Sequence, residues 1–200
     1  MITVWQSSAE LGDPHICSDS VNRLSLIFSV YEALVKRDAA GAYRPSLAER
    51  WSVGADARAW TFTLRAGVRF HDGTSLRADD VVASFGRVLD PAIGGAFGTQ
   101  GVYLSYLGDA EIAKLDDRTV RIVTAEPMAD LLDLLVAMPI GPAGAIDRLP
   151  GEYVGSGPYR ISKRSPRETV LEAFAGYWGE TPRFGTVRWV AEESAAARAA

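Results

Sequence analysis

The feature that most constrains this chain is a strict two-residue alternation between positions 60 and 70. Large apolar side chains occupy only even positions there, while the odd positions carry mostly threonine and arginine. The apolar members are Trp60, Phe62, Leu64, Val68 and Phe70. Because successive side chains of a strand point to opposite faces, this pattern predicts a half-buried β-ribbon. Gly67 within this stretch predicts a bend in the ribbon.

The ribbon runs into His71, Asp72 and Gly73, which are typical of a chain reversal because glycine adopts positive φ without steric cost. A helix is predicted next, with its buried stripe at Val81, Val82, Phe85, Val88 and Leu89. Asp79 and Asp80 then fall in its first turn, where the helix dipole favours each negative charge by about 0.3–1 kcal/mol.

A histidine beside carboxylates can also be an acid–base centre or a metal ligand. A metal site lacks partners, since His15 is distant and neither HxxxH nor CxxC spacing occurs. We therefore favour a turn and a helix start around His71, with catalysis or metal binding as the alternative.

Short strands and helices are predicted along the rest of the chain. Strands are expected at 2–6 and 186–191, hairpins at 110–124 and 155–174, and helices over 21–35 and from Pro127. This mixture predicts a mixed α/β (α+β) architecture.

Composition excludes several classes of protein. The net charge of -4 argues against nucleic-acid binding, which requires a basic face. No apolar run is long enough to span a bilayer, and the single Cys17 rules out an internal disulfide. The start, MITVWQSS, lacks the features of a secretory signal, and EESAAARAA reads as a helix cut short. We therefore expect the sequence to be a piece of a longer protein.

Several phrases together resemble the family 5 extracellular solute-binding proteins, the peptide-, dipeptide- and nickel-type receptors of ABC importers. They are YEALV, RPSLAERWSVGADARAWTFTLRAGVRFHDGTSLRADDVVASFGRVLDP, GSGPYRI and FAGYWGETPRFGTVRWV. The resemblance covers nearly the whole chain. In two respects the sequence departs from the family: Arg77 stands where members usually place Ser or Thr before the helix, and the usual signal peptide is missing.

The resemblance implies a fold like that of type II periplasmic binding proteins, with this chain as the N-terminal lobe, a mixed sheet plus a β-rich subdomain. We expect residues 1–35 and 155–200 to form the core of this lobe and 36–154 an inserted subdomain. The second lobe and the C-terminal return are then absent. Hinge closure between lobes encloses the ligand in such proteins. The apolar face left exposed could support a dimer.

The resemblance implies binding without bond-making, and hence no catalytic residue, cofactor or metal. The solute is expected to be an oligopeptide or dipeptide, ahead of nickel complexes, opines and oligosaccharides. It would be delivered to an ABC permease in the membrane from a periplasmic or extracellular location.

Five residues are candidate ligand contacts. The loop DPHICSD resembles the stretch that lines the family's cleft, which points to Cys17, Ser18 and Asp19. In GTQGVYLSYLGD, Tyr103 and Tyr106 are candidates because an aromatic ring gives contact area and its hydroxyl a hydrogen bond. Helix capping or ordinary packing is the alternative for each.

Two other functions stay open at this point. A hydrolase could use Ser156 in GSGPY, but a nucleophile elbow needs G-x-S-x-G between a strand and a helix, whereas this serine precedes Gly-Pro and a strand. A cytoplasmic transcriptional regulator could carry such a module as its solute sensor. The first hundred residues of the full gene, signal peptide or winged helix, would distinguish these.

Overall fold

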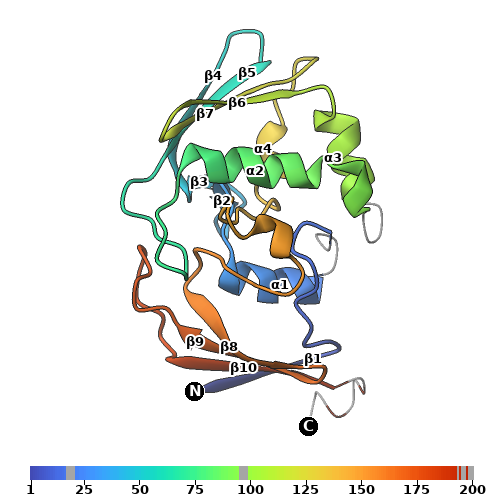
Figure 1. Cartoon of the computed structure of the whole chain (residues 1–200), viewed down its shortest axis with the longest axis vertical. Helices are drawn as coiled ribbons and strands as arrows, with labels where there is room; N and C mark the ends of the chain where they lie inside the picture. Colours follow the sequence, from blue (N-terminus) through green and yellow to red (C-terminus); the bar gives the residue numbers. More distant parts are fainter. Residues whose placement is uncertain (17–20, 95–98, 193, 195–196, 198–200) are drawn as a thin grey trace.

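Two four-stranded sheets lie at opposite ends of the molecule, with helices between them (Figure 1). The computed structural model describes residues 1–16, 21–94, 99–192, 194 and 197. We call the first sheet the terminal sheet; its strands follow the order β1 (Ile2–Gln6), β10 (Thr186–Ala191), β9 (Glu168–Ala173) and β8 (Tyr159–Ser165). The strand β1 is parallel to β10, and the other pairs are antiparallel.

The second sheet, here the ribbon sheet, is antiparallel throughout. Its order is β4 (Ala48–Val53), β5 (Ala59–Leu64), β7 (Thr119–Val123) and β6 (Glu111–Asp116). The predicted alternation is confirmed, since Trp60, Phe62 and Leu64 are buried on one face of β5. Gly67 has a φ of +78° at the predicted bend, and Val68 and Phe70 beyond it are buried again.

Among the described residues, four α-helices and short connecting elements accompany the two sheets. They are α1 (Val21–Val30), α2 (Ala78–Val88), α3 (Thr99–Leu107) and α4 (Leu131–Leu135), with the 3₁₀ turns η1 (Pro91–Ile93) and η3 (Ile146–Arg148) and the small pair β2 (Val35–Arg37) and β3 (Tyr43–Pro45). The helix α2 runs along the ribbon sheet, and α1 along the terminal sheet (Figure 1).

The molecule has two hydrophobic cores, one beneath each sheet. In the first, Val81, Phe85 and Val88 of α2 pack with the apolar face of the ribbon sheet, and Leu89 packs against them. Of the predicted stripe, only Val82 lies outside this core. In the second, Leu26 and Ile27 of α1 pack with inward side chains of the terminal sheet, which are Leu171, Val187 and Trp189. Burying these faces supplies the main stabilisation of each half.

The start of α2 confirms the predicted first-turn roles of its carboxylates. The buried Asp80 carboxylate accepts hydrogen bonds from the backbone N–H groups of Arg77, at 2.7 Å, and Ala143, at 2.8 Å. Asp79 forms an ion pair with Lys114 at 2.8 Å. Arg77 itself offers no side-chain cap, so Asp80 satisfies this helix end from within the first turn.

The helix predicted over 21–35 is wrong in its second half, because α1 ends at Val30. The Val30 carbonyl accepts a hydrogen bond from the backbone N–H of Gly157 at 2.9 Å. The chain then turns extended, Glu32 forms a β-bridge with Ile140, and Val35 begins β2. Tertiary pairing thus overrides the helical spacing of the apolar residues.

The helix predicted to open at Pro127 is also wrong in its start, since α4 begins only at Leu131. The segment before it is held by the ribbon sheet. The N–H of Met128 donates to the Ala57 carbonyl at 2.9 Å, and the Trp60 indole donates to the Met128 carbonyl at 3.2 Å. The two predicted hairpins are confirmed as β6–β7 and β8–β9.

Candidate functional site

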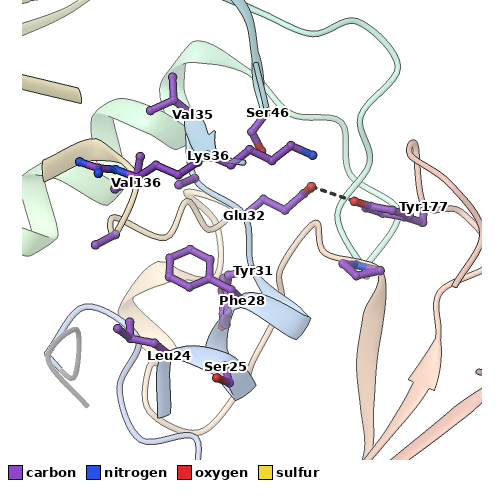
Figure 2. A pocket seen from close by; sticks show the side chains of 14 residues that line it. Leu24, Ser25, Phe28, Tyr31, Glu32, Val35, Lys36, Ser46, Val136 and Tyr177 are labelled. Atoms are coloured by element: carbon purple, nitrogen blue, oxygen red, sulfur yellow. Dashed lines mark hydrogen bonds between the residues drawn. The ribbon is translucent and has the colours of Figure 1, made fainter. Parts of the chain in front are cut away.

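An open cavity of about 600 Å³ lies where the two cores meet (Figure 2). Its walls are mainly apolar and come from α1, from the strand after it and from the segment following α4. Leu24 and Phe28 of α1 line it together with Tyr31, Val35 and Val136. Cavities of this size at the junction of two structural units are common binding sites for small molecules.

The carboxylate of Glu32 lies in the wall of this cavity, which Lys36 and Arg37 also line. It accepts three hydrogen bonds, all from neutral donors. The Tyr177 hydroxyl donates to Oε1 at 3.0 Å, while the Trp178 indole and the Ser156 hydroxyl donate to Oε2 at 2.7 and 2.9 Å. Figure 2 shows Glu32 pointing across the cavity towards Tyr177. We call these four residues the Glu32 cluster.

Burial raises the pKa of Glu32 above its ordinary value, and the hydrogen bonds from the cluster oppose that rise. Lys36, exposed at the cavity rim, lowers the pKa of Glu32 by its charge. Within the part of the chain that the structure describes, no cation forms an ion pair with Glu32. Neutral donors therefore carry most of the compensation for burying this charge.

A second layer supports the cluster from the ribbon-sheet side. The Arg65 guanidinium lies over the Trp178 ring, 4.4 Å from its centroid, a cation–π contact. Arg65 also donates to the Ser46 carbonyl at 3.1 Å, and Ser46 lines the cavity. The cluster is thus braced by both halves of the molecule.

His71 lies close to this cluster without completing a catalytic triad. Its Nδ1 accepts from the Gly155 N–H at 3.3 Å, which leaves the proton on Nε2 to donate to the Gly157 carbonyl at 3.0 Å. A serine nucleophile needs its base within hydrogen-bond reach of the hydroxyl, whereas Ser156 donates to Glu32. Burial lowers the pKa of His71, consistent with a neutral ring.

The other histidine is buried in a separate ionic cluster. Arg87 of α2 pairs with Asp13, donating to Oδ1 at 2.9 Å, and both side chains are buried. His15 donates from Nε2 to the Pro139 carbonyl at 2.9 Å, and its Nδ1 accepts from the Arg87 guanidinium at 3.2 Å. Burial lowers the pKa of His15 to about 4. This first part of the loop DPHICSD therefore fixes α2 rather than lining the cavity.

The described residues contain no group of three or more His, Cys, Asp or Glu side chains placed to hold a metal ion. Nor is any helix among them long and apolar enough to cross a membrane.

The structure describes two of the five predicted ligand contacts. Cys17, Ser18 and Asp19 lie outside the described residues. Tyr103 is only 4% exposed; it packs in the core of the ribbon sheet, and its hydroxyl donates to the Leu134 carbonyl at 3.3 Å. Tyr106 on the same helix is 57% exposed. Neither tyrosine lines the cavity. Their role in ligand binding stays a prediction.

Sequence reasoning missed Glu32 and Tyr177 as site residues. Both stand in phrases that carried the family resemblance, YEALV and FAGYWGE, but nothing in either phrase marks the residue as facing a cavity. Only the three-dimensional contact between the two stretches identifies these residues as lining one cavity.

Solved structures with this arrangement are periplasmic binding proteins. The chain superposes with a TM-score of 0.86 and 23% identity on DppA, the ABC transporter-associated periplasmic binding protein of Helicobacter pylori in complex with the peptide STSA. The match covers 100% of this chain and 44% of that one. With MoaA of A. tumefaciens R10, in complex with mannopinic acid, the TM-score is 0.85 at 26% identity, covering 99% of this chain and 42% of that one. The predicted fold class, a mixed α/β lobe of the type II periplasmic-binding-protein kind, is confirmed.

The chain belongs to the bacterial extracellular solute-binding proteins, family 5, whose middle-region model matches residues 42–200. It is 33% identical over 168 residues to the dipeptide-binding protein of Escherichia coli (strain K12), covering 72% of this chain and 31% of that protein. It is 30% identical over 187 residues to the glutathione-binding protein GsiB of the same strain, covering 88% of this chain and 35% of that protein. The chain thus spans about a third of the length of these curated relatives.

Proposed function

We propose that this chain is the N-terminal lobe of the substrate-binding component of an ABC importer, and that it captures an oligopeptide or dipeptide. The cavity at the junction of the two cores carries this proposal, because it offers apolar walls and a hydrogen-bonded carboxylate to a small solute. The names of its relatives, which include a dipeptide-binding protein, support a peptide as solute.

The cavity is open on one side, which suits a ligand that a second lobe would enclose. We propose that residues 1–35 and 155–200 form the core of this lobe around 36–154. The separation of the two hydrophobic cores supports this division. The second lobe and the C-terminal return would belong to the remainder of a longer, periplasmic or extracellular protein, which delivers its solute to a membrane permease. The dimer through the open face stays a prediction that sedimentation of the chain tests.

The proposal includes no chemical step. The Ser156 hydroxyl donates to Glu32, and both ring nitrogens of His71 are engaged by backbone groups. This arrangement supports a binding surface rather than a hydrolytic site. Incubation with peptides followed by mass spectrometry should return them uncleaved.

Calorimetry against di- to pentapeptides tests the function. The full-length protein should bind, and this chain should bind weakly or not at all, because half of the contacts belong to the second lobe. Equally tight binding by the chain would refute the two-lobe proposal. Failure of the full-length protein to bind any of these peptides would refute the peptide assignment.

A further inference from the structure

Three stretches distant in sequence meet at one carboxylate. Glu32 follows α1, Ser156 precedes β8, and Tyr177 with Trp178 lies in the turn between β9 and β10. The hydrogen bonds span separations of 124, 145 and 146 residues. No local backbone pattern joins these stretches, so their meeting depends on contacts between distant residues. The Glu32 carboxylate bonds to side chains of both other stretches, in addition to the backbone bond from the Gly157 N–H to the Val30 carbonyl.

Besides Glu32 itself, both of the other stretches contribute to the cavity wall. The side chain of Tyr177 lines the cavity, and so does Pro158, two residues after Ser156. Tyr177 is only half-buried, so packing alone encloses its ring incompletely. Its hydroxyl hydrogen bond to Glu32 therefore contributes substantially to fixing the ring at the cavity edge.

We propose that Glu32 is a positioning residue for the cavity. By holding Tyr177 and the Ser156 stretch, it sets the shape of the wall against which a solute packs. The inference concerns the wall itself; it rests on the proposed function only for the identity of the natural solute. Glu32 acts here through other residues and need not touch the solute.

The chemistry of the donors predicts how substitutions at Glu32 behave. A glutamine oxygen can accept from Trp178 and Ser156 in place of Oε2, and its amide can donate to the Tyr177 hydroxyl, which can also accept. Glu32→Gln should therefore preserve the cluster. Glu32→Ala removes the acceptor for all three donors and leaves the Trp178 indole, which can only donate, without it.

Asp80→Ala is the matched control. Asp80 is also a buried carboxylate that accepts hydrogen bonds from neutral donors, here two backbone N–H groups. It does not line the cavity. Its loss should lower stability without releasing Tyr177, which separates a positioning role from general destabilisation.

The first measurement is the ¹H–¹⁵N spectrum of the 200-residue chain at a temperature where every variant is folded. The Trp178 indole resonance, assigned with Trp178→Phe, should move upfield and broaden in Glu32→Ala. It should stay near its wild-type position in Glu32→Gln and Asp80→Ala. Equal shifts in Glu32→Ala and Asp80→Ala, or no shift in either, would overturn the proposal.

The second measurement is fluorescence titration with anilinonaphthalene sulfonate, a dye for apolar cavities. Glu32→Ala should weaken binding about fivefold, the equivalent of one lost hydrogen bond, while Glu32→Gln and Asp80→Ala stay within about twofold. Val136→Trp places a larger side chain in the cavity wall and should abolish dye binding. No dye binding by the wild-type chain, or binding that survives Val136→Trp, would also count against the proposal. Peptide calorimetry on the full-length protein fails or succeeds independently of these results.

Discussion

Replacing Gly155 by alanine should strongly destabilise the chain. A Cβ at Gly155 would lie 2.0 Å from the Val30 carbonyl oxygen and 2.7 Å from the Val30 carbonyl carbon. Both partners are backbone atoms, so no side-chain rotation can relieve the overlap. The Gly155 backbone does not have a positive φ, so the steric overlap alone causes the effect.

The cost follows from the hydrogen bonds that the required shift would break. Gly157 donates to the Val30 carbonyl at 2.9 Å, and His71 donates through its backbone N–H to the Gly155 carbonyl at 2.9 Å. The Gly155 N–H donates to His71 Nδ1 at 3.3 Å. Each such bond contributes about 1 kcal/mol net, so the loss of the three gives about 3 kcal/mol.

Urea unfolding followed by tryptophan fluorescence measures this loss as a lower midpoint at an unchanged slope. The control is Gly144→Ala, because a Cβ at Gly144 would meet no atom within 4 Å and Gly144 has no positive φ. The control should be neutral or slightly stabilising. If the free energy of unfolding of Gly155→Ala lies within about 0.5 kcal/mol of the wild-type value, the close approach of Gly155 to Val30 does not constrain the fold, which would refute this prediction.

Three further predictions concern stability. Arg87→Met strands the buried Asp13 carboxylate and should lower the free energy of unfolding by about 3–5 kcal/mol, which thermal denaturation measures; a loss below about 1 kcal/mol would contradict a buried pair. His15, whose folded pKa of about 4 lies below its ordinary 6.5, should make the chain less stable as pH falls from about 6.5 to 4, because the unfolded chain binds the proton more readily there. Urea midpoints across this range should fall less steeply in His15→Gln, and identical slopes would refute the assignment. Gly86 lies at an exposed position inside α2, and a Cβ added there would meet no atom within 4 Å. Gly86→Ala should raise the free energy of unfolding by about 0.5–1 kcal/mol, seen as a higher urea midpoint, and a decrease would contradict the open space at this position.

The elements that sequence predicted well are those whose information is local. The alternation in β5, the bend at Gly67 and the buried stripe of α2 each depend on residues within about ten positions of one another, so period and turn chemistry suffice. The same holds for the hairpin turns of β6–β7 and β8–β9.

Predictions failed where a distant segment competes for the same backbone. The apolar residues after Val30 keep helical spacing, yet Gly157, more than a hundred positions away, bonds to the last turn of α1. The segment after Pro127 is likewise held by Ala57, in the turn between β4 and β5, and by Trp60 of β5. Neither partner is visible in the local pattern.

The cavity could not be predicted from sequence for a related reason. Its lining comes from α1 and the following strand, from Ser46, from Val136 and from the stretches at Pro158 and Tyr177. No two of these regions share a periodicity, and their meeting depends on how the two cores are joined. Fold-level resemblance predicted that a solute site exists; it did not identify the side chains that line this cavity.

The contacts around Ser156 also explain why the sequence alone left two roles open for His71, a turn or an acid–base or metal site. A ring beside Asp72, with Asp79 and Asp80 nearby, suggests shared proton chemistry, but in the fold each carboxylate has its own local partners. The ring instead contacts Gly155 and Gly157, the two residues that flank Ser156, accepting from one and donating to the other. Protonation of Nδ1 would abolish the acceptor, so this role requires the neutral ring that burial favours. His71 therefore fixes from one side the stretch that Glu32 holds from the other, and both act on the wall of the same cavity.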